Sequence, residues 1–164
     1  GFLPLAKDFI SIEWEGLAEM ERLLDGMEER IERIAKEEYT DFGFLVEEAV
    51  KALMPRDEGD LESSYNIAPA RREGDEIVVE GGSNSEYAVR RHEEPYRMGV
   101  YPKYDNGAKF PGYYVNGRGA RTRNKPGFRG EKAGRKFQER AVNLLKPDFE
   151  KMNKRILERV LGGE

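Results

Sequence analysis

Residues able to do chemistry are few in this chain, and most of them are carboxylates. Among its 164 residues there is no cysteine and a single histidine, His92. The lack of thiols excludes disulfide scaffolds, thiolate zinc sites, iron–sulfur clusters and cysteine nucleophiles. A serine–histidine–aspartate triad would depend on His92 alone. The search for a site therefore turns to acidic clusters and to the basic residues that balance them.

The first acidic cluster surrounds Gly59. Asp57, Glu58 and Asp60 crowd carboxylates around one glycine, as the loops that bind hard cations do. The five-ligand spacing and the distal glutamate of an EF-hand are missing. The sequence favours a polar turn in which Gly59 adopts a positive φ.

The second cluster is His92-Glu93-Glu94, which follows a short apolar run at Tyr87. It could act as an acid/base group, but no nucleophile or substrate-orienting signature lies near it. A strand end whose imidazole bonds to the backbone is the favoured interpretation. Nuclease chemistry would need a metal held by carboxylates such as Asp57, Asp60, Glu93 or Glu94. An enzyme is the least favoured class, and no cofactor or metal is expected.

Charge is divided unevenly along the chain. Residues 1–62 carry 18 acidic and 7 basic side chains, whereas residues 63–164 carry 14 and 21. Within 95–136 there are 11 basic residues and only two acids, Asp105 and Glu131. Such asymmetry is typical of a polar interaction surface, whose partner is nucleic acid or the acidic half of a neighbouring copy.

Residues 95–130 are predicted to be a long basic loop rich in tyrosine and glycine. Four prolines and seven glycines keep this stretch out of regular structure. Arginines between glycines and tyrosines could follow a phosphate backbone or lie across another subunit, and both interpretations stay open. The predicted contact residues are Tyr101, Tyr104, Tyr113, Tyr114, Arg118, Arg121, Arg123, Lys125 and Arg129. The loop is not expected to reach the first helix of its own chain.

The elements around this loop predict a single α+β domain over 1–164. Residues 1–55 are predicted to be helical, because apolar residues from Ile10 to Ile34 recur in steps of three and four, with Gly16 and Gly26 as possible bends. Thr40-Asp41 offers an N-cap for a second helix or lies within a continuation, and Pro55 ends it. Residues 61–94 predict a small antiparallel meander, with a turn at 71–75 and a strand at Tyr87. Residues 131–161 predict a C-terminal helix on the sheet, kinked or divided at Pro147.

Three short motifs resemble a family of neck or tail-completion proteins of tailed phages. Residues 49–64 are similar to the pattern "A…P.D.G.L..S", Tyr87-Ala88 with His92-Glu93 to "YA…HE", and residues 130–141 to "G.KFL..A". They occur in the order of the family. The resemblance implies structural roles for Pro55 and Gly59 in the helix-to-strand turn, for Tyr87 in packing the strand and for Phe137 in docking the last helix. The long insertion at 95–130 and the acidic first half depart from the family pattern.

The resemblance implies a non-enzymatic virion protein of the neck or tail, made in the host cytoplasm and lacking catalytic residues. It would assemble as a ring of identical copies, a hexamer or a multiple of one, beside other neck, connector or tail proteins, with DNA in the lumen. The alternative is a nucleic-acid-binding module that uses the basic segment 95–136. The longest apolar runs are only a few residues, so no contact with a membrane is expected.

Overall fold

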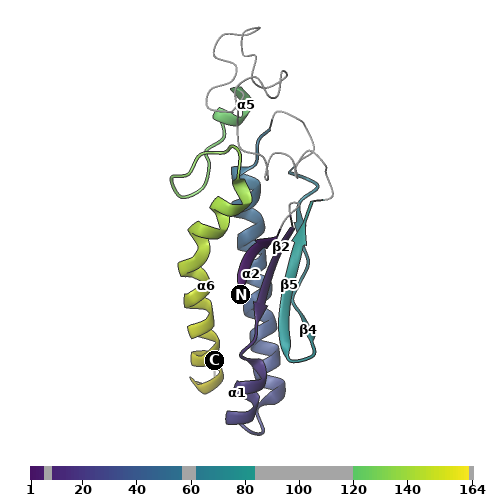
Figure 1. Cartoon of the computed structure of the whole chain (residues 1–164). Helices are drawn as coiled ribbons and strands as arrows, with labels where there is room; N and C mark the ends of the chain where they lie inside the picture. The colour runs from purple at the N-terminus through teal and green to yellow at the C-terminus, as the bar shows by residue number, and fades with distance from the viewer. Residues whose placement is uncertain (6–8, 57–61, 84–119, 163–164) are drawn as a thin grey trace.

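Two long helices and a small antiparallel sheet make up the computed structural model, which describes residues 1–5, 9–56, 62–83 and 120–162. The helices are α1 (Leu17–Leu23), α2 (Glu28–Leu53), the short α5 (Ala120–Arg123) and α6 (Phe137–Gly162). The strands are β1 (Phe2–Leu5), β2 (Phe9–Trp14), β3 (Asn66–Ile67), β4 (Arg71–Glu73) and β5 (Glu76–Gly82). The predicted α+β class, with the C-terminal helix packed on the sheet, is confirmed (Figure 1).

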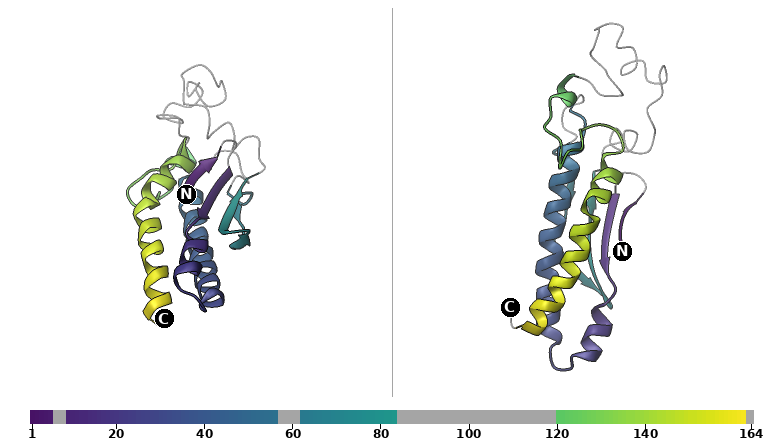
Figure 2. Two further views of the ribbon diagram at one scale, coloured as in Figure 1. Left: turned by 60° about the horizontal axis from the view of Figure 1, so that its bottom comes forward. Right: turned by 90° about the vertical axis from the view of Figure 1, so that its left-hand side faces the viewer.

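The sheet has the order β1-β2-β5-β3, and β4 pairs with β5 beside β3. All four pairings are antiparallel, with Ile12 opposite Val79 at the centre of the sheet. The first two strands come from the N-terminus. Because β2 pairs with β5, the sheet brings residues 9–14 beside residues 76–82. Figure 2 shows α2 and α6 running side by side along it.

The helix predicted for the first residues is wrong for 2–5 and 9–14, which are strands. Ile10 and Trp14 are four positions apart, and a step of four fits the period of a helix and the period of a strand equally well. The alternation of Ile10, Ser11 and Ile12 is the strand signal, since both isoleucines are fully buried. The helical period begins only after Gly16, which is the N-cap of α1.

Helix α2 runs without a break through Thr40-Asp41, so the predicted N-cap is wrong and the continuation is confirmed. The Thr40 hydroxyl instead accepts a hydrogen bond from the backbone N–H of Ala70, at 3.0 Å. The helix ends at Leu53, two residues before Pro55, as predicted. At Gly43 the sheet comes so close that a Cβ would lie 2.9 Å from Cγ1 of Val79.

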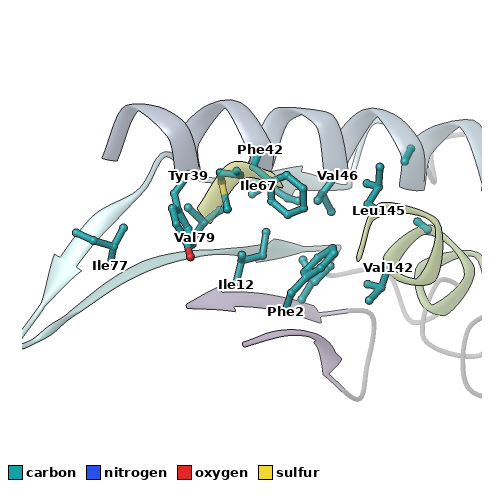
Figure 3. Packing of buried hydrophobic residues seen from close by; sticks show 14 of the residues in the cluster. Phe2, Ile12, Tyr39, Phe42, Val46, Ile67, Ile77, Val79, Val142 and Leu145 are labelled. Atoms are coloured by element: carbon teal, nitrogen blue, oxygen red, sulfur yellow. The ribbon is translucent and has the colours of Figure 1, made fainter. Parts of the chain in front are cut away.

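The core lies between the sheet, α2 and α6 (Figure 3). Rings from three elements meet in it, because the Phe2 ring lies 5.0 Å from that of Phe42 and 5.4 Å from that of Phe149. Tyr39 is fully buried, and its hydroxyl donates to Oδ1 of Asn153 at 2.8 Å. Burial raises the pKa of the Tyr39 hydroxyl well above its ordinary value. Beside it, Glu38 accepts hydrogen bonds from Arg155 and Arg159, which ties α2 to α6.

The rest of the sequence prediction is partly right. The predicted turn at 71–75 is shorter, because Arg71–Glu73 form β4 and only Gly74 and Asp75 remain in the turn. The strand predicted at Tyr87 lies outside the described residues. The last helix begins at Phe137 and not at 131, and Pro147 lies inside it, so the two-helix alternative is wrong.

Candidate assembly surface

The predicted contact residues fall into two groups. Five of the predicted contact residues lie outside the described residues: Tyr101, Tyr104, Tyr113, Tyr114 and Arg118. Gly59 and Tyr87, which are predicted to have structural roles, also lie outside the described residues. Arg121 is placed only as part of the short helix α5, whereas the structure describes Arg123, Lys125 and Arg129 with their side chains.

Lys125 is a buried cation at the C-terminal end of α2. Its Nζ donates to the backbone oxygens of Lys51 and Met54, both at 2.7 Å, and to Oε1 of Glu62 at 2.6 Å. Only 2 % of its side chain is exposed. The last carbonyls of a helix have no partner within the helix and carry partial negative charge, so an ammonium group satisfies and stabilises them.

Neighbouring contacts fix the chain on both sides of Lys125. Oγ1 of Thr122 accepts a hydrogen bond from the backbone N–H of Arg56 at 2.8 Å, and the N–H of Gly134 donates to the oxygen of Leu53 at 2.9 Å. Glu62 also accepts from Nε of Arg56 at 3.1 Å. The stretch 122–134 is therefore packed on the end of α2.

Burial and ion pairing have opposite effects on the pKa values of Lys125 and Glu62. Burial lowers the pKa of Lys125, and the carboxylate of Glu62 opposes that shift. At Glu62 burial favours the neutral acid, but Lys125 and Arg56 together hold its pKa below the ordinary value. The Glu62 carboxylate is therefore ionised near neutral pH, and it favours the charged form of Lys125.

Lys125 is predicted to contact another subunit, but these contacts bury its side chain within its own chain, at the end of the helix opposite to its first residues. Lys125 binds α2 of its own chain. Arg129 pairs with both carboxylate oxygens of Asp148 on α6, at 2.7 and 3.0 Å, and its guanidinium lies 5.1 Å from the centre of the Phe128 ring. Arg123 and 44 % of the Arg129 side chain remain exposed. No pattern in the sequence distinguishes the buried cation from the exposed ones.

The predicted packing role of Phe137 agrees with its place in the structure. Phe137 is fully buried at the first residue of α6, and Gln138 beside it is fully buried too. Gln138 accepts a hydrogen bond from the Tyr65 hydroxyl at 2.5 Å and donates to the backbone oxygen of Phe9 at 3.0 Å. The start of α6 is thus bonded to β2, through Phe9, and to Tyr65, the residue before β3.

The sequence interpretation missed a second surface, the outer face of the sheet. Ile10, Ile12, Ile77 and Val79 point to the helices, so the residues between them point away. The charged side chains gathered on this outer face are Glu13, Glu15, Arg71, Glu73, Glu76 and Glu80. Arg71 pairs with Glu73 and with Glu80. We call this set the acidic face. The sequence prediction places its glutamates in a helix, a turn and the meander, and does not bring them together.

Three carboxylates of the acidic face crowd together. Oxygens of Glu13, Glu15 and Glu76 lie within 4.8 Å of one another. Partial burial, followed by the like charges of Glu13 and Glu15, raises the pKa of Glu76 above its ordinary value. Such a carboxylate gives up part of its solvation and gains repulsion on folding, so this corner of the sheet favours a positively charged neighbour.

We expect Glu76→Gln to raise the free energy of unfolding at neutral pH. A carboxyl with a raised pKa in the folded state binds its proton more tightly there, so its ionisation opposes folding above that pKa. The advantage of the variant should shrink as the pH falls toward the ordinary carboxyl range, about 4, and vanish below it. Urea unfolding of both proteins across this range measures it. An advantage that grows on acidification would contradict the raised pKa.

Within the ranges that the structure describes, no helix is both long and apolar enough to cross a membrane. The carboxylates that nuclease chemistry would need, at 57–60 and 93–94, lie outside those ranges.

Comparison with known proteins gives one finding. Residues 18–90 match the model of the family described as "Bacteriophage HK97-gp10, putative tail-component". No curated protein and no solved structure gives a significant match. The matched stretch runs from α1 past β5 and includes the first sequence motif and Tyr87-Ala88 of the second, whereas His92-Glu93 and the third motif, at 130–141, lie beyond it. Over residues 18–90 the chain is thus similar to a family of phage tail components, and the resemblance to neck and tail proteins of tailed phages is confirmed.

Proposed function

We propose that this protein is a non-enzymatic structural component of the phage neck or tail, which completes the tail or joins it to the head as a ring of identical copies. The family match carries the proposal, because the family is one of phage tail components. A structural role in the virion follows from that family; the neck position, the ring and its number of copies are the proposal.

The described contacts support an assembly role. Lys125, Thr122 and Gly134 fix the chain after the basic segment to the end of α2, while Ser83 before it bonds through its hydroxyl to that of Ser64 at 2.5 Å. The described residues on both sides of 84–119, where most of the predicted contact tyrosines lie, are therefore bonded to the helices and strands of the domain, which we call the frame.

Mass measurement tests the proposal. Light scattering over a range of concentrations, alone and with purified heads or tails lacking this protein, should give one defined oligomer or stoichiometric addition to the particle. A chain that stays monomeric at every concentration and binds neither particle would contradict it.

The nucleic-acid alternative predicts a different result. Each phosphate contact should add nearly one unit to the salt dependence of DNA binding. Two of the described cations, Lys125 and Arg129, already pair with Glu62 and Asp148, so they contribute little to such a slope. Tight DNA binding by a monomer, without assembly, would favour that module over the ring.

A further inference from the structure

The acidic face lies on the side of the sheet opposite to the helices. Arg72 of β4 bonds to Glu21 of α1 and Glu32 of α2, so the side chains that alternate with it, Arg71 and Glu73, point the other way. The aromatic contact of Phe2 with Phe149 places α6 on the helix side as well.

Apolar side chains border the acidic face at one end. Leu3 and Phe9 share the outer side with Ser11 and Glu80, because Leu3 lies opposite Ser11 and Ser11 opposite Glu80. They are 59 % and 38 % exposed. A surface that combines exposed apolar residues with uncompensated charge is typical of a contact with a protein of opposite charge.

Among the described strands β1 lies at the edge of the sheet, and its outer edge is less suited to a partner than the face. Gly1 and Glu13 exchange both backbone hydrogen bonds, at 2.7 and 2.9 Å, so Leu3 and Leu5 also point their backbone groups to β2. Phe2 and Pro4 are left at the open edge, and proline has no N–H to donate. The edge thus offers a single N–H, and a proline in an edge strand discourages the addition of another strand.

A basic surface lies at the start of α6. Its cations are Arg123, Arg129, Lys132, Arg135, Lys136 and Arg140, which we call the basic shoulder. Arg129 binds Asp148 of α6, and Arg140 binds Glu131 at 3.1 Å, so the shoulder is built on α6. Lys132 is exposed, and 42 % of the Lys136 side chain is exposed.

The two surfaces are complementary but separated within one subunit. The acidic face has five glutamates against one arginine, and the shoulder has six cations against Glu131 and Glu139. Because Arg129 binds Asp148 of α6, the shoulder lies on the helix side of the sheet, whereas the acidic face lies on the other side. Opposite charges on opposite sides of a subunit can meet only between copies.

We propose that the acidic face of one copy binds the basic shoulder of the next. The contact is heterologous, since two different surfaces meet, and repetition of such a contact closes a ring when the rotation between copies permits it. The inference rests on the proposed ring function and names the surfaces that build it. Leu3 and Phe9 add apolar area to the contact.

Charge reversal on either side tests the pairing. The face variant carries Glu13→Lys and Glu76→Lys, and the shoulder variant carries Lys132→Glu and Lys136→Glu. We expect each alone to associate at least about tenfold more weakly than the unchanged chain, because like charges then face each other. An equimolar mixture should recover the oligomer with the two variants alternating, because the lysines of the reversed face then meet the glutamates of the reversed shoulder while the other contact keeps its original charges. Native mass spectrometry reads these states directly.

The control variant reverses two exposed glutamates elsewhere, Glu29→Lys on α2 and Glu158→Lys on α6, and changes the net charge as the face variant does. It should assemble like the unchanged chain, and circular dichroism checks the folding of all three variants. If the folded face and shoulder variants still form the full oligomer, the inference fails and the proposed function stands. If only the shoulder variant loses assembly, the shoulder binds another surface and the inference also fails. An unchanged chain that never assembles removes the proposed function itself.

Discussion

Replacing Phe137 with alanine is expected to lower the free energy of unfolding by about 3–5 kcal/mol. The ring is fully buried at the first residue of α6, and its loss leaves a cavity between the helix and the sheet. Gln138, the next residue, bonds to Tyr65 and to the backbone of Phe9, so movement at this point loosens those contacts too. Urea unfolding followed by the fluorescence of Trp14, the single tryptophan, measures the loss.

Phe44→Ala is the matched control. Phe44 lies on α2 with 53 % of its surface exposed, so the same chemical change removes little buried area. Its effect should stay within about 0.5 kcal/mol, the range of ordinary surface substitutions. A loss below about 1 kcal/mol for Phe137→Ala would mean that the site collapses around the gap and that this ring does not dock the helix.

Sequence patterns located most of the helices because their apolar periods are long. The stripe from Ile31 to Leu53 spans about six turns of α2, and no strand period fits a run of that length. The failure at residues 2–14 has a physical cause. Ile10 and Trp14 suit both periods, and the partner that turns the segment into a strand, β5, lies more than 60 residues further along the chain. Pairing between distant segments leaves no local signal.

The candidate site was harder to predict than the fold. The excess of positive charge at 95–136 is visible in the sequence, but which cations bind their own chain is decided by tertiary contacts. Lys125 and Lys132 stand in similar basic surroundings, yet the first is buried against α2 and the second is exposed. The acidic face escaped notice because Glu13 and Glu76 are far apart in sequence and meet only across β2 and β5.

Lys125→Met should lower the free energy of unfolding by about 3 kcal/mol, the low end for a buried ion pair that loses one partner. The backbone oxygens of Lys51 and Met54 lose their donor and stay buried behind the new side chain. Methionine has a similar length and preserves the packing, so the loss reports mainly the missing charge and hydrogen bonds. Glu62 is 31 % exposed and can take up water, which keeps the loss at that low end.

Three measurements separate this account from a general sensitivity to changes at this position. Lys132→Met makes the same chemical change at an exposed residue and should cost no more than about 0.5 kcal/mol. Glu62→Gln keeps an acceptor for Lys125 and should cost about 1 kcal/mol, since only the charge is lost. Trypsin should cleave after Arg123 faster in Lys125→Met than in the unchanged chain, because the stretch 122–125 is then released from the end of α2. If Lys125→Met unfolds like Lys132→Met and cleavage at Arg123 is unchanged, the ammonium does not fix this stretch, and the basic segment is held to the frame by other contacts.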